Sequence, residues 1–192
     1  LGAGDLAAII GQFDVGALVS AKGIAEGVSN SNWLIETSGQ SGSGARFILT
    51  MYEKRVEAAD LPFFLGLLDH LAGHGCPVPR TIHDRENRAY RFHDGKALAL
   101  IEFLTGVSVS EPTPGQAFAV GAALGQVHLA AADFAGMREN ALGLDGWKQL
   151  AGACGPEGLA TIQPGLGTLV ERELAVLERT WPAQLPRSVI HA

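Results

Sequence analysis

The chain has 192 residues, 47% hydrophobic and 18% charged, so it is long enough to bury a core and lacks the composition of a disordered segment. Its net charge of -6 argues against a nucleic-acid binder, which needs basic patches. No apolar run approaches the roughly 20 residues of a membrane span, and two cysteines are too few for a disulfide framework. We therefore expect one domain or two small lobes, a cytoplasmic location, and neither nucleic acid nor membrane as partner.

The first predicted element is a short amphipathic helix that ends near Gly11, with Asp5 as its N-cap. Its apolar residues follow the i, i+3, i+4, i+7 rule: Leu6, Ile9, Ile10 and Phe13.

Three strands are then predicted, and the rest of the chain is organised around them. Residues 17–22 are β-compatible, residues 33–35 resume an apolar strand, and residues 47–52 alternate as a strand with one buried face does. The second connection, residues 37–45, is almost all Gly, Ser and Thr, so we expect it to be mobile.

The first connection, residues 23–30, has two interpretations. Its glycines allow a backbone to approach nucleotide phosphates closely, with N–H groups facing the anion. The alternative is an ordinary hairpin loop, because the segment matches neither Gly-x-x-x-x-Gly-Lys-Ser/Thr nor Gly-x-Gly-x-x-Gly. Taken alone, these residues favour the hairpin loop.

A second helix and a hairpin complete the first half. The helix follows Asp60, has Pro62 in its first turn and ends at Gly73, and Asp94-Gly95 joins strands at 88–93 and 96–104. The helix is predicted to bury Leu61, Phe64, Leu65, Leu68 and Leu71. Residues 1–106 are therefore predicted to form an α+β lobe with a mostly antiparallel sheet.

A mainly helical second lobe is predicted over residues 107–192, with the boundary near residues 105–111. Apolar residues recur at helical spacing over 117–131 and over 166–181, where Pro182 stops the second helix. Residues 188–191 are predicted to form a short strand.

This order of parts resembles the two-lobed protein-kinase-like fold. It is most similar to the aminoglycoside phosphotransferase and choline kinase group, and within that group to the homoserine kinases. The segments that carry the resemblance are KGIAEGVSNSNWLI (22–35), RFILTMYEKRVEAADLPFFLGLLDHLAGHGCPVP (46–79), IEFLTGVSV (101–109), LGQVHLAAADF (124–134), MRENALGLDGW (137–147) and LPRSVIHA (185–192).

The resemblance implies an ATP- and Mg²⁺-dependent phosphorylation of L-homoserine to O-phospho-L-homoserine, in threonine biosynthesis. It places three residues near the phosphates and three at the adenine edge: Gly27, Ser29 and Asn30, and then Ile101, Glu102 and Phe103. It makes His191 the histidine of the His-x-Asp motif that opens the catalytic loop.

Arg138 and Asn140 are candidates for binding the carboxylate of an amino-acid substrate, because an arginine can grip a carboxylate with two hydrogen bonds. The alternative is that both residues brace a loop.

The sequence departs from the family at the third strand. Related kinases often carry Lys or Arg there, whereas the matching position is Thr50, which supplies no cation. Lys54 or Arg55 could reach inward, although a surface role is the favoured reading. In related kinases an acid braces this phosphate-facing cation. Because Thr50 stands in place of the cation, such a role for Glu57 or Asp60 is not favoured.

The chain also ends at Ala192, whereas the family's catalytic Asp would be two residues after His191, followed by the Asn and Asp that hold Mg²⁺. We therefore expect residues 1–192 to be an inactive fragment with uncovered apolar surface that favours self-association. Two alternatives remain: a kinase for choline, an aminoglycoside or methylthioribose, and a nucleotide-binding module without transfer chemistry.

Other residues receive a structural interpretation. His70 and His74 lie four apart on a predicted helix and could share a metal. No third ligand is evident, so they are read as two exposed helix residues. His128, Trp147 and Trp181 are predicted to be interior residues.

Overall fold

The computed structural model describes residues 1–25, 30–53, 58–182, 184–185 and 188–190. The chain divides into two compact units, one of residues 1–136 with 188–192 and one of residues 137–187, and each is described by itself. Among the described residues, no helix has both the length and the apolar character needed to cross a bilayer.

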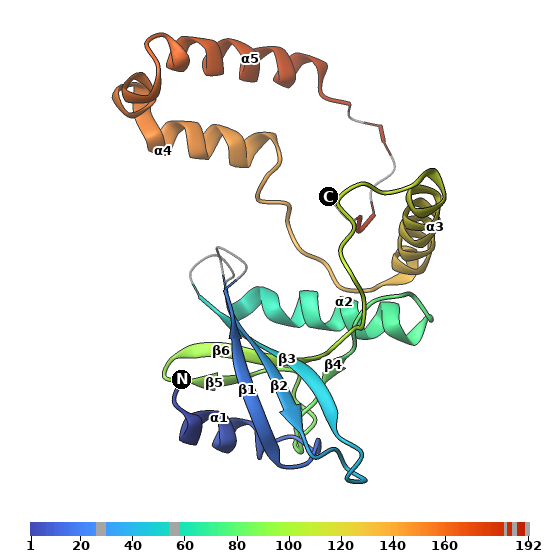
Figure 1. Ribbon diagram of the computed structural model, residues 1–192. Helices are drawn as coiled ribbons and strands as arrows, with labels where there is room; N and C mark the ends of the chain where they lie inside the picture. The colour runs from blue at the N-terminus through green and yellow to red at the C-terminus, as the bar shows by residue number, and fades with distance from the viewer. Residues whose placement is uncertain (26–29, 54–57, 183, 186–187, 191–192) are drawn as a thin grey trace. The chain divides into compact units, whose positions relative to one another are not determined.

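The first unit is built on one antiparallel sheet (Figure 1). Its strands are β1 (Leu18–Ile24), β2 (Asn30–Thr37), β3 (Ala45–Tyr52), β4 (Thr81–Ile82), β5 (Arg91–His93) and β6 (Lys96–Glu102). They lie in the order β1-β2-β3-β6-β4, and β5 pairs with β6. Its helices are α1 (Ala3–Ile10), α2 (Leu61–Gly73) and α3 (Pro114–Ala130), with 3-10 turns η1 (Ala58–Asp60) and η2 (Ala131–Asp133). The predicted α+β class is confirmed.

One face of the sheet packs against α1, and this is the main core. Alternate residues of β2, β3 and β6 meet the apolar side of the helix, as the alternation over residues 47–52 predicted for β3. The buried members are Leu6, Ile9, Ile10, Phe13, Val15, Ile35, Leu49, Met51, Leu98 and Leu100. The predicted N-cap is wrong. Gly2 occupies that position, and the Asp5 carboxylate accepts a 2.8 Å hydrogen bond from the Gly2 N–H.

The opposite face packs against α2. Leu61 and Leu65 of the helix meet Ala97 and Ala99 of β6, whose small side chains allow close approach. Phe64 was predicted to be buried but is 36% exposed. The helix rests on the sheet along one side only, so Phe64 lies at its margin, edge-on to the neighbouring Phe63 ring.

The mobility expected of residues 37–45 stays a prediction. At the ends of this connection the Thr37 hydroxyl donates to the Val15 carbonyl at 2.6 Å, and the Gly44 N–H donates to the Ser38 carbonyl. The Asp94-Gly95 hairpin is confirmed, with φ of 48° and 76°.

The second unit contains α4 (Leu144–Ile162) and α5 (Leu166–Thr180), which run side by side (Figure 1). Helix α5 was predicted, although Trp181 lies just beyond its end. Helix α4 was not predicted, since it is rich in Gly and Ala and is kinked where Gly155 (φ 66°) precedes Pro156. Trp147 and Trp181 were expected in a core, but they meet edge to face at 5.6 Å and are 36% and 42% exposed.

The predicted strand at residues 188–191 is not present in its described part, because Ser188–Ile190 have no strand partner there. Val189 instead packs beside Leu71, Cys76 and Ala131. His191 lies outside the described residues.

Candidate nucleotide site

The predicted phosphate loop connects β1 and β2, which pair in antiparallel register from Leu18–Thr37 to Ile24–Asn32. Gly27 and Ser29 lie outside the described residues, and Asn30 opens β2. The Asn30 Oδ1 atom is buried and has no hydrogen-bond partner in the described part of the chain. Leaving a buried polar atom unpaired costs about 1–3 kcal/mol, so this carboxamide is a candidate ligand contact.

Thr50, the position that matches the family's third-strand cation, is held inside the sheet. It pairs in register with Asn32 on β2 and Ala99 on β6, and it is 8% exposed. Its hydroxyl donates a 2.9 Å hydrogen bond to Asn32 Oδ1. Thr50 therefore fixes the Asn32 side chain on the α2 side of the sheet.

Lys22 is a cation on that same side that the sequence analysis missed. On β1 it alternates with Ala21 and Gly23, whose register partners Ile35 and Trp33 belong to the α1 core. Lys22 is exposed and lies two residues along β1 from the register partner of Asn32. The sequence analysis looked for a cation only on the third strand. The two-residue period of β1 separates Lys22 from Ala21 and Gly23, but its register with β2 decides which face Lys22 occupies.

Glu53 directly follows β3, and its side chain contacts residues of β2 and β6. Its carboxylate accepts a 2.9 Å hydrogen bond from the Ser31 hydroxyl and forms a 2.8 Å ion pair with Lys96 Nζ. Of the acids proposed for a bracing role, Glu57 lies outside the described residues and Asp60 is the N-cap of α2. Glu53 is thus a carboxylate at the loop end of the sheet with a defined cation partner.

The predicted adenine-binding connector leaves the sheet at the end of β6. Ile101 pairs with Ile48 and Thr81 inside the sheet, and the Glu102 N–H donates to the Arg80 carbonyl at 2.9 Å. The Arg46 guanidinium lies over the Phe103 ring, and its central carbon is 5.8 Å from the ring centroid. The Glu102 N–H is therefore already used within the fold, and the adenine contact of residues 101–103 stays a prediction.

Arg138 and Asn140 belong to the second unit. Asn140 Oδ1 accepts a 3.0 Å hydrogen bond from the Leu142 N–H, a local turn that leads into α4. Arg138 Nη1 contacts the neighbouring Glu139 carbonyl at 3.5 Å. Asn140 therefore has the loop-bracing contact, and its substrate role remains a prediction.

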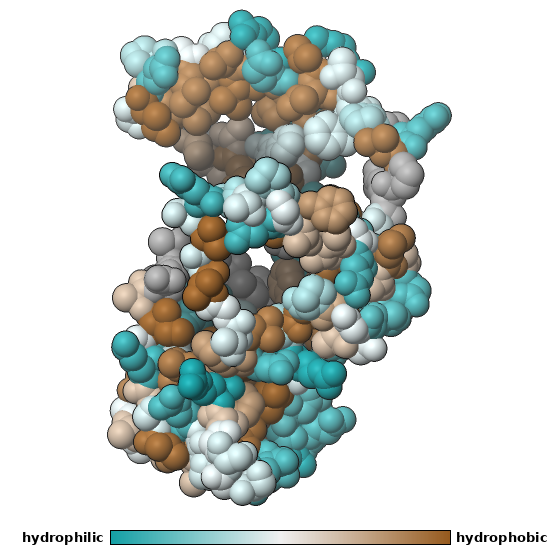
Figure 2. Space-filling model, turned by 45° about the vertical axis from the view of Figure 1, so that its right-hand side comes forward, coloured by the Kyte–Doolittle hydropathy of each residue, from teal (hydrophilic) through white to brown (hydrophobic). Residues whose placement is uncertain are grey.

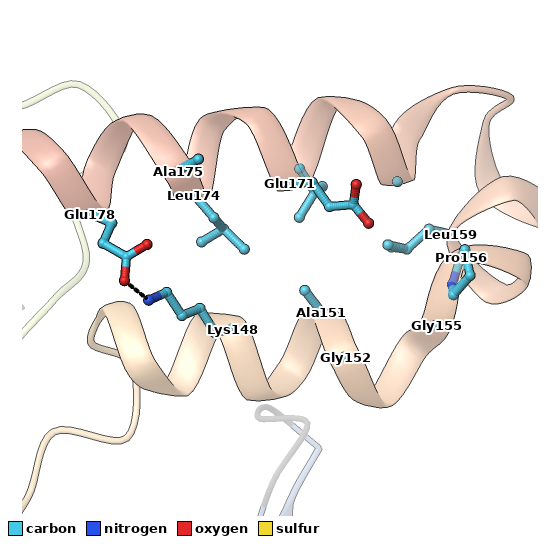
Figure 3. A pocket seen from close by; sticks show the side chains of 12 residues that line it. Lys148, Ala151, Gly152, Gly155, Pro156, Leu159, Glu171, Leu174, Ala175 and Glu178 are labelled. Atoms are coloured by element: carbon cyan, nitrogen blue, oxygen red, sulfur yellow. Dashed lines mark hydrogen bonds and ion pairs between the residues drawn. The ribbon is translucent and has the colours of Figure 1, made fainter.

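An open groove of about 390 Å³ runs between α4 and α5 (Figure 3). Small residues of α4, among them Ala151 and Gly152, face Leu174 and Glu171 of α5. One end is closed by the 2.6 Å ion pair between Lys148 and Glu178, which lowers the pKa of the Glu178 carboxyl. The groove is mainly apolar and has no cluster of converging polar groups, so it is a packing seam rather than a reactive site.

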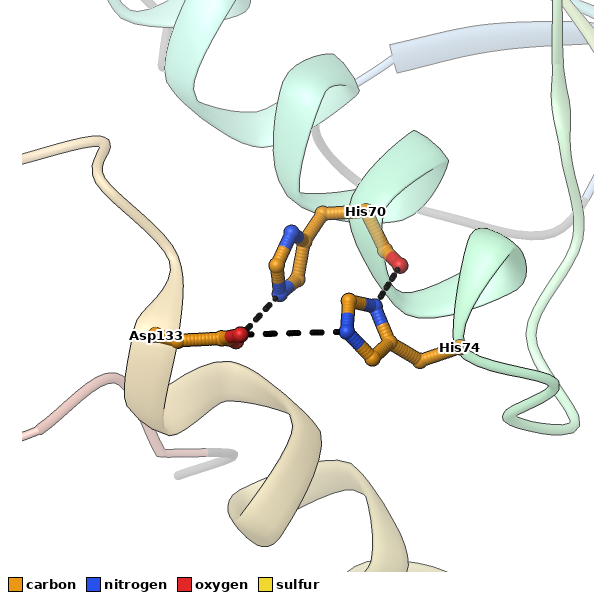
Figure 4. Close-up of side chains that lie close together, drawn as sticks. All are labelled: His70, His74 and Asp133. Carbon is orange, nitrogen blue, oxygen red and sulfur yellow. Dashed lines mark hydrogen bonds and ion pairs between the residues drawn. The ribbon is translucent and has the colours of Figure 1, made fainter.

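His70 and His74, predicted as two exposed helix residues, are brought together with Asp133 of η2 (Figure 4). His70 Nε2 lies 3.1 Å from one Asp133 oxygen, and the His70 side chain is only 20% exposed. The prediction is therefore wrong for His70. The third residue was missed because it lies about 60 positions later in the chain.

Comparison with known proteins identifies the class. Residues 20–192 match the model of the phosphotransferase enzyme family, and the chain belongs to that family. It is 46% identical over 190 residues to a homoserine kinase of Azorhizobium caulinodans and 48% identical over 191 residues to one of Mesorhizobium japonicum. These alignments cover 99% and 98% of the chain but 57% of each relative.

Solved structures support the fold. A spectinomycin phosphotransferase in complex with ADP and spectinomycin matches with a TM-score of 0.68 at 10% identity, covering 97% of this chain and 60% of that one. An aminoglycoside phosphotransferase from Alicyclobacillus acidocaldarius matches with a TM-score of 0.55 at 15% identity, over 88% of this chain and 52% of its own. At these identities the likeness concerns the fold alone.

Proposed function

We propose that the protein to which these residues belong phosphorylates L-homoserine with ATP, giving O-phospho-L-homoserine for threonine biosynthesis in the cytoplasm. The observation that carries the proposal is the identity of 44–48% to curated homoserine kinases, which extends over 98–99% of the chain. In such transfers the protein mainly positions the two reactants and neutralises charge.

The nucleotide is proposed to bind on the α2 side of the sheet. Gly27, Ser29 and Asn30 would approach the phosphates, and backbone groups of the connector would meet the adenine. The unpaired Asn30 oxygen supports this placement, since a carboxamide at the loop mouth can turn its NH₂ group toward an anion. Lys22, on the same face as Thr50, is a candidate for the charge that Thr50 does not provide.

The described residues do not supply a binding set suited to Mg²⁺. Their one cluster of three potential ligands, His70, His74 and Asp133, is rich in imidazole, whereas Mg²⁺ prefers oxygen ligands and bound water. The resemblance to the homoserine kinases implies Mg²⁺ ligands that follow His191. We therefore propose that residues 1–192 bind ATP without transferring its phosphate.

Turnover assays test both parts of this proposal. The full product of the reading frame and residues 1–192 alone are given MgATP with L-homoserine, choline, an aminoglycoside or methylthioribose, and ADP release is followed. We expect the full product to prefer L-homoserine by at least about 100-fold in kcat/KM, and residues 1–192 to stay at background. A preference for choline would refute the substrate, and turnover by residues 1–192 would refute only their inactivity.

Two matched substitutions test the roles proposed for Asn30 and Asn140. Asn30→Asp places a negative charge where phosphates are proposed, so we expect ATP affinity measured by calorimetry to fall at least about 10-fold, or about 1.4 kcal/mol. Asn140→Asp is the same change in the second unit, where it would repel the homoserine carboxylate and raise KM for homoserine with ATP affinity unchanged. Equal effects of both variants on ATP binding would contradict these assignments.

Self-association is proposed for the 192-residue chain because apolar side chains lie exposed along α4 and α5. Leu150 is 55% exposed, Ile162 75% and Leu169 43%, and brown side chains gather on this helical pair at the top of Figure 2. Light scattering at two concentrations tests this. A monomer at both concentrations would refute it.

A further inference from the structure

We propose that His70, His74 and Asp133 form a binding site for one divalent cation of the zinc type, which ties the C-terminal end of α2 to the turn η2. The site is independent of the proposed kinase activity. It rests on the geometry of the three side chains, on the hydrogen bond that orients one of them, and on the position of the cluster at a helix end (Figure 4).

The ligand atoms already converge. One potential ligand atom from each residue lies within 4.8 Å of the other two. His70 Nε2 is 3.1 Å from Asp133 Oδ1, and His74 Nε2 is 3.9 Å from Asp133 Oδ2. Zn²⁺ with ligands at about 2.0–2.1 Å in a tetrahedron sets neighbouring ligand atoms about 3.3 Å apart. Since the three ligand atoms lie within 4.8 Å of one another, coordination requires the side chains to close by at most about 1.5 Å.

The tautomer of His74 is the one that a metal needs. Its Nδ1 lies 2.8 Å from the His70 carbonyl oxygen, which can only accept, so Nδ1 carries the hydrogen. In the neutral ring the lone pair is then on Nε2, the atom that faces Asp133. A ligand histidine whose other nitrogen donates to a backbone carbonyl is the usual arrangement around zinc.

His70 is oriented by packing. Its ring lies 4.3 Å from the His74 ring and 5.3 Å from the Phe134 ring, centroid to centroid. Its Nε2 donates to the Ala130 carbonyl at 2.7 Å without the metal. When Nε2 binds the cation, the neutral ring changes tautomer: the proton leaves Nε2, a proton is taken up from solvent at Nδ1, and the hydrogen bond to the Ala130 carbonyl is exchanged for the metal bond.

The surroundings favour a cation of this class. His74 caps α2, where the carbonyl end of the helix carries partial negative charge, and Asp133 adds a full one. Two imidazoles and one carboxylate suit Zn²⁺ rather than Mg²⁺ or Ca²⁺, which prefer oxygen ligands. His74 and Asp133 are 45% and 72% exposed, so solvent can supply the remaining ligand.

The site would connect parts that are distant in sequence. Below the cluster, Leu71 and Cys76 pack against Ala131, so α2 and the α3–η2 segment already touch through apolar contacts. A cation held from both sides adds a link that must break before these segments separate. The bound metal is therefore expected to raise the melting temperature.

The test uses tag-free residues 1–192 carrying Cys154→Ser, which removes the exposed thiol. Zn²⁺ and, separately, Mg²⁺ are titrated by calorimetry, and melting is followed with and without Zn²⁺. We expect about one Zn²⁺ per chain and no heat from Mg²⁺ in the same concentration range. His74→Ala and Asp133→Asn should each weaken Zn²⁺ binding by more than about 10-fold and abolish the melting shift.

The control is His93→Ala, which removes a histidine 3.5 Å from the exposed Asp94. It should leave Zn²⁺ affinity unchanged. His74 and Asp133 lie at the surface, so their variants are expected to fold, and far-ultraviolet circular dichroism checks this. Absence of Zn²⁺ binding, or binding that His74→Ala and Asp133→Asn leave intact, would overturn the proposal. The three side chains would then only hydrogen-bond α2 to η2.

Discussion

The Thr50 hydroxyl donates a 2.9 Å hydrogen bond to the side-chain oxygen of Asn32, its register partner across the β2–β3 pair. The position where a cation was expected thus holds a buried hydroxyl that orients an amide. The amide lies two residues from Asn30, at the start of the same strand. Around Asn32 and Thr50, this side of the sheet is thus held by a side-chain hydrogen bond between two strands, and Lys22 of β1 is the proposed cation.

Thr50→Val removes this hydrogen bond and keeps the shape of the side chain. We expect the free energy of unfolding in urea to fall by about 0.5–1.5 kcal/mol, because the donor is lost and Asn32 must find water. Thr105→Val, in an exposed segment, is the control and should change stability by less than about 0.5 kcal/mol. Equal stability of the two variants would show that the bond contributes nothing.

Asp84 is a buried carboxylate with several donors. Its side chain is 0% exposed, and it accepts hydrogen bonds from the backbone N–H groups of Glu86 and Arg88 and from the side chains of Arg88 and Arg91. Burial alone would raise the pKa of this carboxyl, but these donors hold the pKa well below its usual range.

Asp84→Asn should therefore lower the free energy of unfolding by about 1–3 kcal/mol at pH 7. The folded pKa lies below the unfolded value of about 3.9, so the contribution is present above that pH and is lost as pH falls through the folded pKa. The difference from wild type should shrink in strong acid. Asp94→Asn, at an exposed hairpin turn that suits Asn-Gly, should cost almost nothing.

The contribution of His83 to stability depends on pH in the opposite direction to that of Asp84. Burial of the ring tends to lower its pKa, but hydrogen bonds to Asp69 at 2.7 Å and Asn87 at 3.2 Å, with the Asp69 charge, outweigh it, so the pKa is raised. Stabilisation by charged His83 is therefore full below the unfolded pKa of about 6.5 and is lost as pH rises through the folded pKa.

Urea unfolding of wild type and His83→Gln at pH 5.5 and pH 9 measures this contribution. The stability difference between the two proteins should be larger at the lower pH, with the high-pH pair serving as the internal control. A difference that is the same at both pH values would show that the Asp69 contact does not depend on the charge of His83.

Local patterns predicted the parts of the fold that depend on neighbouring residues. The alternation in β3, the Asp94-Gly95 turn and the apolar stripe of α5 each have a period or a turn residue that can be read from a short window. Helix α4 has no such stripe, because Gly and Ala occupy much of it and Pro156 interrupts it.

Features that depend on packing across the chain could not be read in this way. Asp133 reaches His70 and His74 only because α2 packs against the α3–η2 segment, and spacing along the sequence carries no sign of that contact. The face that Lys22 occupies follows from its register with β2, which no window of β1 specifies.

The backbone at Gly16 lies close to residues 38–39 of the connection between β2 and β3. Its φ is +86°, and a Cβ built there would lie 2.5 Å from the Gly39 carbonyl oxygen and 2.6 Å from Ser38 Oγ. Gly42 has a similar φ of +77° but has nothing within 4 Å of the same position. The two glycines therefore separate backbone strain from steric clash.

Gly42→Ala should lower the free energy of unfolding by about 1–2 kcal/mol, the cost of a left-handed conformation for an L-residue. Gly16→Ala incurs that cost and must also displace the 38–39 backbone, which adds about 1–3 kcal/mol. Urea unfolding of both variants measures the difference directly. If they lost equal stability, the Gly16–Gly39 approach would relax at no cost, and the connection at residues 37–45 would be as adaptable as its composition first suggested.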